Sequence, residues 1–225
     1  MEPTFDKPTI IGALAEISRL DPNFNIFGVT NHQYKLNPPV PAAELDAFEA
    51  AWGVRLPDDY RYFVMEIGNG GAGPGYGLYP LGLEGIDKTT QLGPLRPAIA
   101  ENLARPFPHA KRWNTDAPDY GDQEEVERRI EENEADYVKD DWVRGAFPIS
   151  NQGCGIIIYL VVSGPQRGYL WVDDRESCGG IYSIGGDDSD PVSFSTWYSD
   201  WLSWSLSEAQ KRARKAKKHK NREKA

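Results

Sequence analysis

Hydrophobic side chains recur at helical spacing in the first third of the chain. Ile10, Leu14 and Ile17 lie four and three positions apart, and Thr9 precedes them as a residue that favours a helix start. Gly53 is the expected end of a second helix. The pattern predicts three helices, over residues 9–20, 41–53 and 56–67, with a polar connection over residues 21–41.

The third predicted helix leads into a glycine-rich loop. It opens with Pro57, whose fixed φ suits a first helical turn, and with acidic residues that favour the positive end of the helix dipole. It ends in the run at residues 68–71, where Gly68 is expected to take a positive φ. Residues 78–81 are predicted to form a short strand that leaves the loop.

Three apolar segments in the second half of the chain are separated by short turns. They cover residues 147–162, 168–173 and 179–184. Because short turns favour antiparallel neighbours, these segments are predicted to form one antiparallel sheet.

A late aromatic segment predicts a further helix over residues 193–206, capped by one of its first serines. Trp197, Trp201 and Trp204 lie four and three positions apart. Aromatic residues at this spacing usually belong to the core, so these indoles are expected to pack against the sheet rather than form a sugar or peptide platform. A basic segment follows, for which a solvated tail is the default expectation, with RNA or a membrane surface as the alternative partners.

Charge is divided unevenly along the chain. The net charge is −9, but residues 1–210 carry 16 basic and 33 acidic residues, whereas residues 211–225 carry nine basic residues and one acidic residue. Residues 122–141 are acidic with sparse apolar positions, which predicts a helix on the surface. An acidic body repels nucleic acid and attracts basic partners, which mainly governs encounter rate and choice of partner.

The composition indicates a folded protein in a reducing compartment. Hydrophobic residues make up 40% of the chain, and no apolar run approaches the roughly 20 residues needed to cross a bilayer. The first residues lack the basic and apolar regions of a secretory signal. Cys154 and Cys178 lie outside CxxC or zinc-ligand spacing. We therefore expect a cytoplasmic location without membrane binding.

No motif of the chain indicates catalysis. Residues 68–73 fit the spacing GxGxxG, but a helix is predicted before them and Pro74 follows, so a structural turn is expected. The histidines lack a partner motif, and Cys154 sits in a segment expected to be core. We expect no cofactor, no metal and no enzymatic activity.

A series of short motifs runs from the third predicted helix to the late aromatic helix. The first comprises Leu56, Pro57, Asp59, Tyr60, Phe63, Asn69, Gly70 and Gly71, and residues 77–81, 147–155, 170–173 and 194–202 follow. In this order the motifs resemble the SUKH superfamily, across roughly residues 45–206. That superfamily takes in bacterial toxin-immunity proteins and a fungal regulator of cell-wall synthesis.

The resemblance implies an α+β fold, with a curved, largely antiparallel sheet packed by helices in a single domain. We expect the SUKH-like domain at residues 41–207, with an acidic insertion at about 116–141. An N-terminal helix and connection would occupy residues 1–40, and a basic tail residues 208–225. No catalytic residues belong to the family pattern.

The resemblance also implies a non-enzymatic binding protein. The expected role is that of an immunity protein that neutralises a cognate toxin, such as a nuclease, by covering its active surface. An intracellular scaffold or regulator with several protein partners is the alternative. The oligomeric state stays open.

Acidic side chains are the candidates for the partner surface, because a nuclease cleft holds Lys and Arg that a carboxylate array can occupy. An aromatic residue of the glycine-rich loop is added, since exposed loops often carry function. The candidates are Asp119, Asp122, Glu124, Glu125, Glu131, Glu132, Asp173, Asp174 and Tyr76. Simpler interpretations stay open, in which the acidic helix is a solvated face and Asp173 and Asp174 form a turn.

Overall fold

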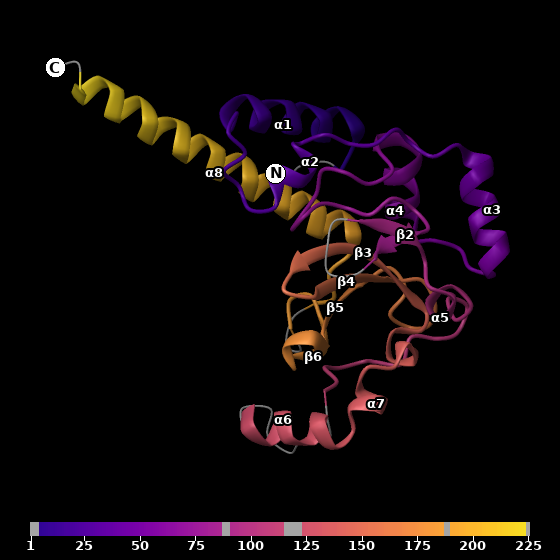
Figure 1. Ribbon diagram of the computed structural model, residues 1–225. Helices are drawn as coiled ribbons and strands as arrows, with labels where there is room; N and C mark the ends of the chain where they lie inside the picture. The colour runs from indigo at the N-terminus through magenta and orange to yellow at the C-terminus, as the bar shows by residue number, and fades with distance from the viewer. Residues whose placement is uncertain (1–4, 87–90, 115–122, 187–189, 224–225) are drawn as a thin grey trace.

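A four-stranded antiparallel sheet lies at the centre of the computed structural model, which describes residues 5–86, 91–114, 123–186 and 190–223 (Figure 1). The strands follow one another in chain order: β3 (Ala146–Gly153), β4 (Ile156–Val161), β5 (Leu170–Asp174) and β6 (Gly180–Ser183). Helices pack around this sheet, so the predicted α+β fold with a largely antiparallel sheet is confirmed.

The first of the three apolar segments is a hairpin of β3 and β4. The chain reverses at Cys154 and Gly155, whose φ angles are 52° and 79°. The next pairing places Tyr159 of β4 opposite Trp171 of β5. Large side chains on neighbouring strands therefore pack directly against each other, which is the usual source of sheet stability.

The first helix, α1 (Lys7–Leu20), begins two residues earlier than predicted. Asp6, and not Thr9, caps it, because the Asp6 carboxylate accepts the backbone N–H of Thr9 at 2.9 Å. The predicted apolar face is buried as expected, and consists of Ile10, Leu14 and Ile17.

The connection after α1 contains one short helix, α2 (Val29–His32). The second predicted helix is α3 (Ala42–Trp52), and it ends at Gly53 with a φ of 63°, as expected. The left-handed conformation at this position favours glycine.

The third predicted helix changes its winding along its length. Residues Asp58–Tyr62 form α4, and residues Phe63–Ile67 form the π-helix η1. Tyr60 and Phe63 are fully buried in the core. Burial of each such side chain stabilises the fold by about 1.5–3 kcal/mol.

Gly68 does not have the positive φ that the sequence predicts, since its φ is −179°. A glycine is required there for space, because a Cβ atom would lie 2.8 Å from the Cβ of Leu36. The positive φ angles belong to Gly70 and Gly71, at 80° and 93°. The predicted strand at residues 78–81 is also wrong, because Leu78 makes only isolated bridges, to Gly71 and Ser150.

The late aromatic helix is much longer than predicted, and forms α8 (Phe194–Glu223). Its buried face consists of Phe194, Tyr198, Leu202, Ser205 and Ala209. The expectation that the three tryptophans belong to the core holds only in part: Trp197 and Trp201 are half-buried and pack against the core, whereas Trp204 is 52% exposed. The helix runs on through the basic segment, and the Lys and Arg side chains described there are exposed to solvent.

The middle of the chain builds smaller elements. A two-stranded antiparallel sheet pairs β1 (Leu83–Gly85) with β2 (Leu92–Pro94). The helices are α5 (Pro97–Ala100), α6 (Gln123–Glu132) and α7 (Glu134–Tyr137), with the 3₁₀ turns η2 (Asp140–Val143) and η3 (Arg175–Ser177). The predicted acidic surface helix is therefore broken at Asn133.

Candidate functional site

Residues of the first motif and of α8 make hydrogen bonds that hold the glycine-rich loop in place. The Asp59 carboxylate accepts the backbone N–H of Ser195 at 2.9 Å, and the side-chain oxygen of Asn69 accepts the N–H of Leu81 at 2.7 Å. The Tyr198 hydroxyl donates to the carbonyl of Ala72 at 3.0 Å. These bonds fix the glycine-rich loop against α8 and the core.

A groove lies beside the glycine-rich loop and has a volume of about 710 Å³. Five separate parts of the chain line it: the region of α2, the loop after η1, the first residue of β2, the β3–β4 turn, and η3. Its lining includes Asn31, His32, Tyr76, Leu78, Asn151 and Glu176. Its volume lies within the range of ligand-binding clefts, about 300–1,000 Å³, and its walls are both polar and apolar.

Two exposed aromatic side chains pack together at one edge of the groove. The ring centroids of Phe27 and Tyr76 are 5.2 Å apart. Phe27 is 59% exposed and Tyr76 is 38% exposed. A Cβ atom on Gly153, which lines the groove, would contact both rings. This exposed aromatic pair is the kind of surface that anchors a protein partner.

His32 is a buried part of the groove wall. Its Nδ1 accepts the backbone N–H of Tyr34 at 3.1 Å, so this nitrogen carries no proton. Burial lowers the pKa of His32 to about 4, and a backbone contact with Gly73 only partly opposes this shift. The imidazole is therefore neutral at pH 7 and serves the architecture of the wall.

The carboxylates of α6 divide between two faces of that helix. On one face, Arg128 pairs with Glu125 at 2.8 Å and with Glu132 at 2.5 Å. Arg129 also pairs with Glu125, at 2.6 Å. Two of the predicted partner residues are thus neutralised within their own helix.

The other face of α6 contributes to an acidic rim, which we define as Glu127, Glu131, Asp174 and Glu176. All four raise the pKa of the Cys178 thiol, although burial is the largest cause of that shift. The four carboxylates, from α6, β5 and η3, therefore lie within electrostatic range of this thiol. Arg112 borders the rim and donates to the carbonyl of Gly179 at 2.8 Å.

Glu176 joins the acidic rim to the groove. Glu176 lines the groove together with Tyr76. Its charge also raises the pKa of the Cys178 thiol, as do the charges of Glu127 and Glu131. Glu176 therefore lines the groove and also lies within electrostatic range of the same thiol as the two carboxylates of α6.

The remaining predicted site residues have different surroundings. Asp173 pairs with Arg175 at 2.7 Å in a nearly buried ion pair. Asp174 is half-buried, and burial raises the pKa of its carboxyl group. Glu124 is exposed on α6. Asp119 and Asp122 lie outside the described residues.

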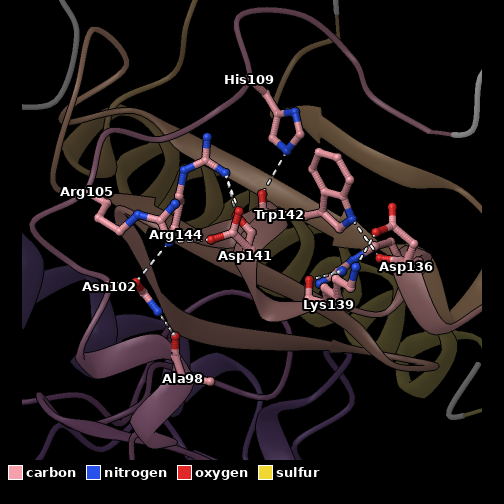
Figure 2. A network of polar contacts seen from close by, with 10 residues as sticks. Ala98, Asn102, Arg105, His109, Asp136, Lys139, Asp141, Trp142 and Arg144 are labelled. Carbon is pink, nitrogen blue, oxygen red and sulfur yellow. Dashed lines mark hydrogen bonds and ion pairs between the residues drawn. The ribbon is translucent and has the colours of Figure 1, made fainter.

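A polar network holds the segment after α6 to the body (Figure 2). His109 donates to the carbonyl of Trp142 at 2.8 Å, and the Trp142 indole donates to the carbonyl of Asp136 at the same distance. The Asp141 carboxylate pairs with Arg105 at 2.5 Å and with Arg144 at 2.7 Å. The segment that follows α6 is thereby fixed, which in turn positions the acidic rim.

Arg175 fixes the same segment from the other side. Its guanidinium donates to the carbonyls of Tyr137 and Lys139 at 2.9 and 2.8 Å, while it pairs with Asp173. Asp173 therefore orients the arginine that ties η3 to the end of α7.

Several residues of the groove and the rim were not among the predicted site residues, among them Glu127, Glu176 and Phe27. Glu127 could have been found from its spacing, because it lies four positions before Glu131 on one helix face. Glu176 and Phe27 carry no such signal, since a turn and a loop place them at the groove.

Other kinds of site find little support in the part of the chain that the structure describes. Within those residues, no group of three or more His, Cys, Asp and Glu side chains is placed to hold a metal ion. Cys154, which was expected in the core, is exposed at the β3–β4 turn. No described helix is long and apolar enough to span a membrane.

The comparison with protein families agrees with this architecture. Residues 39–202 match the SMI1 / KNR4 family (SUKH-1), and the chain therefore belongs to that family. The family includes toxin-immunity proteins, and its members are generally non-catalytic. No curated protein and no solved structure matches the chain.

Proposed function

We propose that this protein is a non-enzymatic immunity protein, which neutralises a cognate toxin domain by covering its active surface. The observation that carries the proposal is the joining of the groove to the acidic rim through Glu176. This surface offers a concave apolar and polar part beside a cluster of carboxylates.

The charge of the surface favours a basic partner. A toxin that cleaves nucleic acid needs Lys and Arg to hold phosphates, and carboxylates can occupy the same cations. Residues 1–210 carry 16 basic and 33 acidic residues, so the body as a whole attracts such a partner. Long-range attraction of this kind raises the association rate and weakens with added salt.

The exposed aromatic pair supplies the second component of the interface. Charged rims contribute mainly to encounter and choice of partner, whereas buried aromatic anchors contribute most of the binding energy. Phe27 and Tyr76 lie where an inserted partner segment would cover them. The expected complex is one-to-one and needs no chemical step.

The direct test uses the toxin domain encoded next to this chain in its genome, purified and assayed for its own activity. Inhibition at one equivalent of this protein, with association that slows as salt rises, supports the proposal. Absence of inhibition contradicts it. Retention of several unrelated proteins from a lysate, without any toxin, would indicate the scaffold function instead.

A further inference from the structure

The C-terminal part of α8 is a polycationic helix, which we call the basic arm and define as residues 211–223. Lys211, Arg212, Arg214, Lys215 and Lys217 are all exposed. Lys211 pairs with Glu208 at 2.7 Å. Lys218, Lys220 and Arg222 continue the basic sequence along the same helix.

The arm is held at a defined place on the body. The preceding part of α8 is anchored by the buried residues Tyr198, Leu202 and Ala209. From this base the helix projects past α1 and away from the sheet (Figure 1). At about 1.5 Å per residue, the stretch from Arg214 to Glu223 reaches about 14 Å. That exceeds the Debye length of about 8 Å at physiological salt, so the end of the arm is screened from the acidic body.

The linear charge density of the arm approaches that of a nucleic acid. Eight cations lie between Lys211 and Arg222, which is one for about every 2 Å of helix axis. Duplex DNA carries one negative charge for about every 1.7 Å. We propose that the basic arm binds the phosphodiester backbone of a nucleic acid, independently of the surface that binds the toxin.

The residue pattern of the arm favours phosphates over other partners. Among the described side chains after Ala209, the apolar ones are only Ala213 and Ala216. A protein interface needs an apolar centre, and a helix that inserts into a membrane surface needs an apolar face. Phosphate contacts need only cations, because counterion release drives them.

Repulsion between neighbouring cations of the arm also favours a polyanionic partner. Lys211 lies four positions before Lys215, and Arg214 lies three positions before Lys217. Like charges at these spacings destabilise a helix. A bound polyanion would remove this repulsion. Binding should therefore stabilise the helix of the arm.

The test measures fluorescence anisotropy of a labelled DNA duplex and of a labelled single-stranded RNA of equal length, titrated with the full chain across a range of salt. The arm variant is R214Q/K215Q/K217Q, in which glutamine keeps helix propensity. The control K7Q/R55Q/K111Q removes three exposed cations from the body, so the two variants have the same net charge.

The proposal expects binding of at least one of the two probes by the unaltered chain and by the control. The arm variant should bind at least about tenfold more weakly, with a salt slope lower by about 2–3 in log units per log unit of salt. Preference for the duplex or for the RNA identifies the source of the phosphates.

Failure to bind either probe overturns the proposal, as does equal binding by the two variants. Binding to anionic phospholipid vesicles alone overturns it in favour of a membrane surface. Arm-dependent dimerisation without nucleic acid, seen by light scattering, overturns it in favour of a second copy of the chain. Circular dichroism of each variant shows that the fold is retained.

Discussion

The carboxylate of Asp59 accepts the backbone N–H of Ser195, so the first turn of α4 caps the first turn of α8 across 136 positions of sequence. The helix that carries the basic arm is thus tied at its start to the helix that leads into the glycine-rich loop. Tyr198 completes the link through the carbonyl of Ala72. The shape of the groove therefore depends on side chains that do not line it.

Replacing Asp59 with alanine should destabilise the protein by about 1 kcal/mol, the usual cost of losing a helix cap. Asp58→Ala is the matched control, because Asp58 lies in the same first turn but its carboxylate is 86% exposed. Urea unfolding measures the free energy of unfolding of both variants. Equal destabilisation by the two variants would show that the bond to Ser195 contributes nothing.

Two glycine substitutions should have opposite effects on stability. At Gly71 the φ is 93°, and a Cβ atom would lie 2.4 Å from the carbonyl oxygen of Lys35, so Gly71→Ala should destabilise by more than about 1 kcal/mol. At Gly12, within α1, a Cβ atom meets nothing, so Gly12→Ala should stabilise by about 0.5–1 kcal/mol. Thermal unfolding compares them. A stable Gly71→Ala variant would contradict the tight loop packing.

Because two histidines are buried, we expect the stability of the fold to decrease in acid. Burial lowers the pKa of both His32 and His109 to about 4, whereas the unfolded chain binds these protons near pH 6.5. The unfolded state therefore holds more protons between these values, and stability is lost as the pH falls from about 6.5 to 4. The loss is up to about 3 kcal/mol for each histidine.

The variants H32N and H109Q test this origin of acid sensitivity. Asn offers an oxygen where His32 accepts from Tyr34, and Gln offers an N–H where His109 donates to Trp142. The double variant should lose most of its pH dependence of stability between pH 6.5 and 4 in urea unfolding. An unchanged slope would assign the acid sensitivity to other groups.

The exposed aromatic pair should matter for binding and not for folding. F27A/Y76A is expected to weaken binding of the toxin domain by about tenfold to a hundredfold, the range of interface anchors. Stability should change little, because both rings are exposed. Calorimetric titration with the toxin domain measures the affinity. Trp204→Ala, which removes another exposed aromatic side chain, is the control. Equal binding by both variants would exclude the pair from the interface.

Amphipathic segments could be predicted from the sequence wherever one apolar face exists. Ile10, Leu14 and Ile17 form such a face, and they are buried. In α8 two stripes satisfy helical spacing, the tryptophans and the face of Phe194, Tyr198 and Leu202. Spacing alone does not decide between them, because the choice depends on how α8 meets α1 and α4.

Long-range contacts account for the remaining differences. Gly68 is needed because Leu36 packs against it, and no local pattern shows that contact. The ion pair between Glu125 and Arg128 could have been predicted from their spacing of three positions. It was not predicted because the segment was assessed by its total charge. Glu176 reaches the groove only because the β5–β6 connection folds back over the β3–β4 turn, where a Cβ atom on Gly155 would meet it.

The most direct measurement is the association rate of the purified toxin domain with charge-reversed forms of this protein. E127K/E131K/E176K changes the acidic rim, and E44K/E66K/E101K changes three exposed glutamates outside the groove and the rim, with the same change in net charge. We expect the rim variant to associate at least about tenfold more slowly at low salt than the control and to lose protection against the toxin. Equal rates and equal protection for the two variants would contradict the assignment of this surface.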